Sequence, residues 1–129
     1  MSRVLVVDDE PHFLAVMQVI LERAGHEVLF AEHGAEGLEK AYQHHPDVIL
    51  LDEMMPGISG GEVCSRIKSD PAVRDIAVIM HSAAPSACAP AYVQAIGADA
   101  ALLKPCLPKE ILDTVETCLR SRLNSSFAS

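Results

Sequence analysis

Five short, largely aliphatic runs recur along the chain, separated by segments in which apolar residues have helical spacing. The runs cover residues 3–7, 28–31, 48–51, 76–80 and 100–103. The third run, from Val48 to Leu51, has no polar residue, which is typical of a strand buried on both faces of a sheet. We therefore predict five strands at these runs.

The intervening segments predict amphipathic helices. Their expected inward faces are Phe13, Val16, Met17, Ile20, Leu21 and Ala24 in the first, Leu38, Ala41 and Tyr42 in the second (34–44), Val63 and Ile67 in the third, and Ile111, Val115, Cys118, Leu119 and Leu123 in the last. Gly25 suits the end of the first helix, and Asp70-Pro71 ends the third. Pro108 suits the first turn of the last helix.

With one more helical segment before the last strand, five strands alternate with five helices. Such alternation requires right-handed βαβ crossovers and a parallel sheet covered on both faces. The predicted fold class is therefore α/β, a doubly wound, five-stranded parallel sheet.

Composition narrows the possible functions of this fold. The chain has 129 residues, of which 50% are hydrophobic, so we expect one globular domain. The net charge is −8 and the ten Lys and Arg residues do not cluster, which argues against direct nucleic-acid binding. No apolar run is long enough for a membrane span, and the first ten residues are not a signal peptide. We expect a cytoplasmic protein with its four cysteines reduced, as small core residues.

Polar residues follow the predicted strands at their carboxyl ends, where open α/β sheets form their active crevice. Strand one leads into Asp8-Asp9-Glu10, and strand three leads into Asp52. His81-Ser82 ends strand four, and Lys104-Pro105 ends strand five. Three carboxylates, a hydroxyl and an ammonium group would therefore meet in one crevice.

Each of these residues also has a purely structural explanation. One of the acids at positions 8–10 suits the cap of the helix that begins at Pro11. Asp52 suits an Asx turn before Pro56-Gly57. Ser82 suits a helix cap, and Lys104 a solvated loop. It is the convergence of the four strand ends that favours a functional site.

Carboxylates gathered at one rim attract a cation, and hard oxygen ligands on an open rim suit Mg²⁺. A cation there screens the charge between a carboxylate nucleophile and a phosphoryl group. Phosphoryl transfer then requires mainly positioning and charge neutralisation, for which Lys104 and Ser82 are suitable residue types.

The chain resembles the receiver domains of two-component response regulators. The resemblance rests on "VLVVDDEP", "VILLDEMMPGISG", "VIMHSA" and "GADAALLKP", in the order and approximate spacing of that family. It implies a chemotaxis-regulator-like, flavodoxin-like (βα)5 fold with strand order 2-1-3-4-5. It also implies a receiver domain at 1–123, and we expect the polar tail 124–129 to be flexible.

The resemblance implies that Asp52 accepts a phosphoryl group from a sensor histidine kinase or a histidine phosphotransfer protein. Asp9, Asp52 and the backbone carbonyl of Met54 would bind Mg²⁺ directly, and Asp8 through a water molecule. Ser82 and Lys104 would each bind a phosphoryl oxygen.

The resemblance further implies a cis peptide bond before Pro105. Glu53 has no family role, and we interpret it as solvated, with Glu10 supporting the acidic pocket electrostatically. We interpret His81 as a strand-end side chain, and the glycines of "PGISGG" as a turn into the third helix.

The chain departs from the family pattern at two places. Ala101 stands where members usually carry Tyr or Phe, so the usual coupling of the Ser82 position to an aromatic side chain cannot operate as such. The segment 83–96 has no charged residue and contains Pro85 and Pro90, which predicts a shortened or irregular fourth helix that is more mobile than the other four. In the family, the 83–123 face binds a downstream protein or forms a homodimer.

Four functions remain open. The first is a single-domain phosphorylation switch. The second is a receiver domain from a larger regulator or hybrid histidine kinase. The third is a Mg²⁺-dependent phosphohydrolase, disfavoured because Glu10 replaces the second Asp of the required DxD. The fourth is a phosphorylation-silent pseudo-receiver. In the receiver interpretation the protein is not an enzyme beyond accepting phosphate from a donor and slow autodephosphorylation. The resemblance ties the rate of autodephosphorylation to the positions of Met54 and Ala84, and neither is a polar, water-orienting residue.

Overall fold

The computed structural model describes residues 2–128 of the chain, with side chains to residue 122. Five parallel strands form one sheet in the order β2-β1-β3-β4-β5, as the resemblance implies. The strands are β1 (Arg3–Val7), β2 (Glu27–Ala31), β3 (Val48–Leu51), β4 (Ala77–Ser82) and β5 (Ala100–Leu103). The helices are α1 (Pro11–Arg23), α2 (Gly34–His44), α3 (Gly60–Ser69), α4 (Pro90–Ile96) and α5 (Pro108–Ala128).

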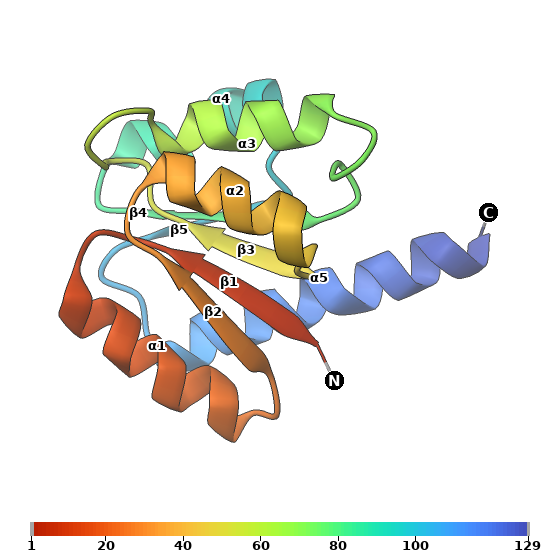
Figure 1. The fold of residues 1–129 in the computed structure, drawn as a ribbon, viewed down its shortest axis with the longest axis horizontal. Coiled ribbons are helices and arrows are strands. Elements are labelled where there is room, and N and C mark those ends of the chain that lie inside the picture. Colours follow the sequence, from red (N-terminus) through yellow and green to blue (C-terminus); the bar gives the residue numbers. More distant parts are fainter. Residues whose placement is uncertain (1, 129) are drawn as a thin grey trace.

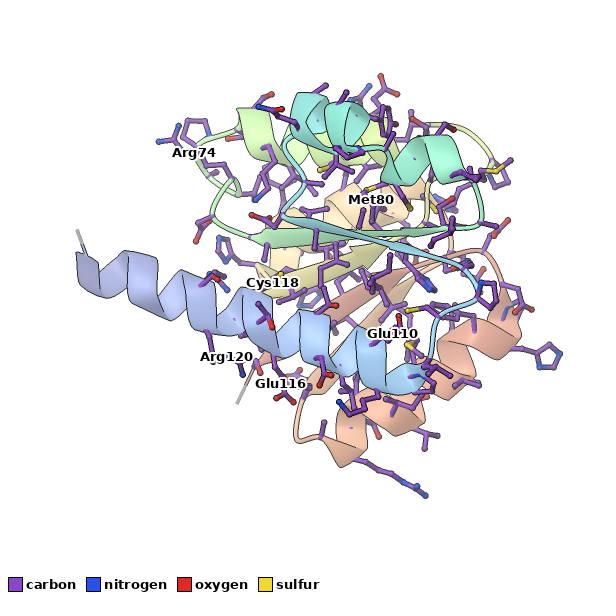
Figure 2. All side chains as sticks on the ribbon, turned by 180° about the vertical axis from the view of Figure 1, so that it is seen from behind. Arg74, Met80, Glu110, Glu116, Cys118 and Arg120 are labelled. Atoms are coloured by element: carbon purple, nitrogen blue, oxygen red, sulfur yellow. The ribbon has the colours of Figure 1, made fainter. Side chains whose placement is uncertain are left out.

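Helices cover both faces of the sheet, which gives three layers (Figure 1). Helices α2, α3 and α4 lie on one face, and α1 and α5 on the other. Figure 2 shows Met80 on the side of β4 that faces α3 and α4, and Cys118 on the side of α5 that faces the sheet. Each face of the sheet therefore has its own hydrophobic core, as the alternation of strands and helices predicts.

The β3 strand is fully buried from Val48 to Leu51, as its unbroken apolar run predicts. The β4 strand begins one residue later than predicted and continues to Ser82, because His81 and Ser82 pair with Leu102 and Leu103 of β5. This pairing extends the buried part of β4 to the crevice end of the sheet.

The prediction for the inward face of α1 is wrong at Ala24, which is exposed, and at Val16. This side chain is 49% exposed, and Leu14 is buried beside Met17 and Leu21 instead. The reason is that α1 also carries exposed apolar residues such as Val19, so its apolar pattern does not single out one face.

Tyr42 was predicted to face inward from α2, and this is also wrong. It is half exposed and donates a hydrogen bond to Asp70 at the end of α3. The inward positions belong to Gly34, Gly37 and Ala41. A Cβ atom on Gly37 would lie 3.0 Å from Val7, so the missing side chain lets α2 approach β1 closely.

The fourth helix, between β4 and β5, is shortened, as the two prolines of this segment predict. A 3₁₀ turn, η1 (Pro85–Cys88), precedes α4, which has only seven residues and none that is fully buried. The predicted mobility of this segment stays a prediction.

The last helix, α5, begins at Pro108 as predicted, and Ile111, Val115 and Cys118 are buried against the sheet. It continues through Ala128 and so includes most of the segment predicted as a tail. The predicted inward side chain of Leu123 lies outside the described side chains. The domain boundary at residue 123 stays a prediction.

The four cysteines are free. Cys64 and Cys118 are buried as predicted, whereas Cys88 and Cys106 are only partly buried. Among the described residues, no helix is both long and apolar enough to cross a bilayer.

Candidate functional site

The pairing of β1 with β3 brings two of the predicted site residues together. Val7 is opposite Leu51 in this ladder, so Asp8 and Asp52 emerge side by side at the carboxyl ends of the two strands. The backbone N–H of Asp52 donates to the carbonyl of Val7, at 3.0 Å, which extends the ladder to the site itself. The position of Asp52 is therefore set by two rigid strands.

Asp8, Asp9 and Asp52 form one acidic cluster. Each offers a carboxylate oxygen, and the three oxygens lie within 4.8 Å of one another. Asp8 and Asp52 are buried, at 1% and 7% exposure, whereas Asp9 is exposed. Oxygen donors from carboxylates at an open rim are the ligands that Mg²⁺ prefers, so the residues present fit this ion.

Lys104 provides the positive charge next to this cluster. Its Nζ lies 2.9 Å from Oδ2 of Asp8 and 3.7 Å from Oδ2 of Asp52. It follows β5, and the peptide bond from Lys104 to Pro105 is cis, as the resemblance implies. Lys104 is therefore not the solvated loop residue of the structural alternative, because it forms an ion pair with a buried acid.

The pKa of Asp52 is raised above its ordinary value. Burial is the largest cause, because it disfavours the charged form. Lys104 partly offsets this rise in the pKa, while Asp8 adds to it by repulsion. A cation at the acidic cluster would favour the ionised carboxylate, which is the form that acts as a nucleophile.

Ser82 lies on the strand between those that lead to Asp52 and Lys104, and it is fully buried. The backbone N–H of Lys104 donates to the Ser82 carbonyl at 2.8 Å. The Ser82 hydroxyl accepts a hydrogen bond from the backbone N–H of Ala84 at 3.2 Å. This turn leads into η1 and α4.

Met54 contributes its backbone N–H to the site, whereas its side chain is 66% exposed. Its N–H donates to Oδ1 of Asp52 at 3.4 Å, which is the Asx-type contact of the structural alternative. This local hydrogen bond and the acidic cluster coexist, so the turn does not exclude a functional carboxylate.

An aromatic stack supports Lys104 from the α1 side and was not predicted from the sequence. The rings of Phe13 and His81 stack with their centroids 4.9 Å apart, and Lys104 Nζ lies 5.1 Å from the Phe13 centroid. His81 is 3% exposed, and its ring nitrogens have no hydrogen-bond partner among the described residues. Burial, with a contribution from Lys104, lowers its pKa to about 4. No short-range pattern indicates this stack, since the three residues are far apart in the sequence.

Glu10 caps α1, so the capping alternative holds for this acid. Its carboxylate accepts hydrogen bonds from the backbone N–H groups of His12 and Phe13. It is exposed and forms no part of the acidic cluster. Its hydrogen bonds fix the start of the helix that carries Phe13.

The interpretation of Glu53 as a solvated side chain is wrong. Glu53 is half-buried, and its two carboxylate oxygens accept hydrogen bonds from Tyr92 of α4 and from the backbone N–H of Gly61, the latter at 2.5 Å. The turn glycines before α3 are as predicted, with Gly57 at φ +85° and Gly60 beginning the helix. Tyr92 is 39 positions away from Glu53, so only the fold reveals this contact.

A family model described as the response regulator receiver domain matches residues 4–116. The chain belongs to this family. Receiver domains of two-component response regulators are phosphorylation-dependent signalling switches and not classical enzymes.

The receiver domain is similar to both short and long relatives. Protein PilH of Pseudomonas aeruginosa is 34% identical over 119 residues, which cover 92% of this chain and 98% of PilH. The alkaline phosphatase synthesis transcriptional regulatory protein PhoP of Bacillus subtilis is 35% identical over 119 residues, 92% of this chain but 49% of PhoP. The chain thus spans about half the length of PhoP and of other transcriptional regulators that it matches.

Solved structures agree with the receiver fold. A CheY-like receiver domain protein from Methanospirillum hungatei superposes with a TM-score of 0.90, at 27% identity over 97% of this chain and 98% of that one. TrrA from Thermotoga maritima, in complex with Mg²⁺ and BeF, has a TM-score of 0.83 at 34% identity, over 92% of this chain and 100% of that one.

Proposed function

We propose that Asp52 accepts a phosphoryl group from a phosphohistidine of a sensor histidine kinase or a histidine phosphotransfer protein. The observation that carries this proposal is a buried carboxylate at the end of β3, next to the carboxylates of Asp8 and Asp9 and to Lys104. Burying a carboxylate is costly, and a buried acid with a raised pKa is typical of functional sites.

Asp9, Asp52 and the backbone carbonyl of Met54 would hold Mg²⁺ directly, and Asp8 through a water molecule. When bound, this ion supplies charge screening between the attacking carboxylate and the phosphoryl oxygens. The three carboxylates are the right donor type for it, and they lie within reach of one another.

In the transfer step, a carboxylate oxygen of Asp52 attacks the phosphorus atom of the donor. The new O–P bond forms as the P–N bond to the donor imidazole breaks. The electron pair of that bond stays on the leaving nitrogen, and the imidazole leaves neutral because its other ring nitrogen carries a proton. The Lys104 ammonium group would move from its ion pairs with Asp8 and Asp52 and pair with a phosphoryl oxygen. The Ser82 hydroxyl, which accepts a hydrogen bond from Ala84, would donate a hydrogen bond to another phosphoryl oxygen.

Further parts of the proposal concern the whole protein. The switch unit is the receiver domain 1–123, followed by the tail 124–129, and it acts in the cytoplasm. Its phosphorylated form signals to a downstream protein through the 83–123 face, or by forming a homodimer, without contacting nucleic acid itself. The alternative is a receiver domain of a larger regulator or a hybrid histidine kinase, since the chain matches 49% of PhoP.

The first test is incubation with acetyl phosphate and Mg²⁺, followed by intact-mass measurement. We expect the mass of one phosphoryl group on the wild-type protein and none on Asp52→Asn. Asp113→Asn, which changes an exposed acid on α5, is the matched control and should be phosphorylated normally. Omission of Mg²⁺ should abolish the gain.

Phosphorylation of the Asp52→Asn variant at wild-type level would show that another residue is the acceptor. If the wild-type protein neither gains mass nor binds Mg²⁺ by calorimetry, the phosphorylation-silent pseudo-receiver is correct instead. Size-exclusion chromatography of both forms then tests the homodimer.

A further inference from the structure

The short helix α4 is held to the rest of the protein by few specific contacts. It has seven residues, carries no charge and has no fully buried residue. The Ile96 carbonyl accepts a hydrogen bond from the Cys64 thiol at its last turn, and the Tyr92 hydroxyl donates to Glu53 near its first turn. The link from Tyr92 to Glu53 joins α4 directly to the residue after Asp52.

Glu53 is itself firmly positioned next to Asp52. Its second carboxylate oxygen accepts from the backbone N–H of Gly61 at 2.5 Å, and its carbonyl accepts from the N–H of Gly60 at 3.0 Å. A Cβ atom on Gly60 would overlap the backbone carbonyl of Asp52. The start of α3 therefore packs against the backbone of Asp52 and fixes the Glu53 side chain.

Tyr92 fits this arrangement closely. A Cβ atom on Gly61 would overlap the Tyr92 hydroxyl, so the absence of a side chain at this position makes room for the tyrosine. The hydrogen bond from a phenol to a carboxylate in a half-buried setting is charge-assisted and stronger than a neutral one. Ala101, on β5, has no side chain that could form an equivalent contact.

The chain path connects the same helix to the other side of the site. Ser82 is followed by the turn in which its hydroxyl accepts from Ala84, and this turn runs directly into η1 and α4. A phosphoryl group on Asp52 would draw the Ser82 hydroxyl toward itself, and the turn that joins this hydroxyl to Ala84 would shift with it. Glu53 would stay with α3, so the geometry of its bond to Tyr92 would be lost.

We propose that the hydrogen bond from Tyr92 to Glu53 holds α4 in its unphosphorylated position and is released when Asp52 carries a phosphoryl group. This inference rests on the proposed function, because it concerns the regulation of the same site. Since coupling between two events is reciprocal, a bond that phosphorylation breaks also opposes phosphorylation. Loss of the Tyr92 hydroxyl should therefore favour the phosphorylated state.

The test is the affinity of Tyr92→Phe for beryllofluoride in the presence of Mg²⁺, measured by calorimetry. Beryllofluoride mimics the phosphoryl group on a carboxylate. We expect Tyr92→Phe to bind it about 5- to 10-fold more tightly than the wild-type protein. Tyr42→Phe is the matched control, because it removes the tyrosine-to-carboxylate bond to Asp70 on the protein surface and should bind as the wild type does.

Tyrosine fluorescence provides a direct view of the bond. The chain has no tryptophan and two tyrosines, so Tyr92 is the sole fluorophore of this type in Tyr42→Phe. A carboxylate acceptor quenches tyrosine emission, and we expect the emission to rise when beryllofluoride and Mg²⁺ are added. Unchanged emission at saturating beryllofluoride would mean that the bond persists, which would overturn the inference.

The remaining outcomes separate the inference from the proposed function. If the wild-type protein neither binds beryllofluoride nor gains a phosphoryl group, the proposed function fails and the coupling fails with it. If the wild type binds and Tyr92→Phe binds equally or more weakly, the coupling is wrong while the role of Asp52 stands. Glu53→Gln, which removes the charge of the acceptor, should also bind beryllofluoride more tightly, and it replaces Tyr92→Phe if that variant does not fold.

Discussion

Lys104 and the buried acids depend on each other at the scale of single residues. Asp8 and Asp52 are almost completely buried, and burying an unpaired carboxylate is costly. The Lys104 ammonium group lies within 4 Å of both and lowers the pKa of Asp52, although burial keeps that pKa above its ordinary value. The same lysine competes with any cation for the Asp8 carboxylate.

Replacement of this lysine should therefore have opposite effects on two measurements. We expect Lys104→Met to bind Mg²⁺ roughly 3- to 10-fold more tightly, because a competing positive charge next to the cluster is gone. We also expect its rate of phosphorylation by acetyl phosphate to fall about 10-fold or more, because the positive charge that neutralises the phosphoryl oxygens is lost. Calorimetry and intact-mass time courses measure the two effects.

Lys109→Met is the control, since it removes the same charge from an exposed ion pair with Asp113 on α5. It should change neither measurement. Weaker Mg²⁺ binding by Lys104→Met would contradict the competition described above.

At the scale of elements, α3 begins with two glycines, Gly60 and Gly61, whose lack of a side chain allows close packing. Gly60 packs against the Asp52 carbonyl, and Gly61 lies under the Tyr92 hydroxyl. Ser59 caps the helix by accepting from the backbone N–H of Glu62. The helix is thereby held against the end of β3 at the residue that carries the proposed chemistry.

Gly60→Ala tests this close packing. Alanine is the better helix former by about 1 kcal/mol, but its Cβ atom would overlap a backbone carbonyl that cannot move without displacing Asp52. We expect a net loss of about 2 kcal/mol in the free energy of unfolding, measured by urea denaturation, together with slower phosphorylation.

Glu62→Ala, at an exposed position in the same first turn, should change the free energy of unfolding by less than about 0.5 kcal/mol. Equal stability of Gly60→Ala and the wild-type protein would mean that α3 is free to shift away from Asp52.

At the scale of the whole molecule, the packing of α1 against the sheet buries the titratable ring of His81. His81 stacks on Phe13 within the layer between the sheet and α1, and its pKa is lowered to about 4. The unfolded chain restores the ordinary value of 6.5, so between these two values it binds a proton that the folded protein does not. His81 therefore makes the fold less stable as the pH falls through this range.

Replacement by phenylalanine should remove this acid sensitivity. We expect the wild-type protein to lose about 2 kcal/mol more of its free energy of unfolding between pH 6.5 and 4 than His81→Phe does. Urea denaturation at several pH values measures the difference, and the comparison cancels the contributions of the carboxylates. His12→Phe, at an exposed position on α1, should follow the wild type. Parallel stability curves for wild type and His81→Phe would contradict the proposed cost of charging the ring.

The sequence predicted the elements better than it predicted how they face one another. Strand and helix positions follow from local spacing, and β3 and the start of α5 were predicted to the residue. The orientation of α1 and α2 was wrong at Val16 and Tyr42, which are both half exposed. Apolar residues at these positions are compatible with either side of a helix, and the choice depends on which side packs closely against the sheet.

What the sequence by itself determined is the order of the elements and the residues at the strand ends. Parallel strands bring their carboxyl ends to one edge, so Asp8, Asp9, Asp52 and Lys104 could be predicted to meet there. Only the tertiary structure decided the contacts of Glu53 with Tyr92 and of His81 with Phe13. The reason is physical: each of these contacts joins distant parts of the chain and depends on side-chain geometry, which no local periodicity encodes.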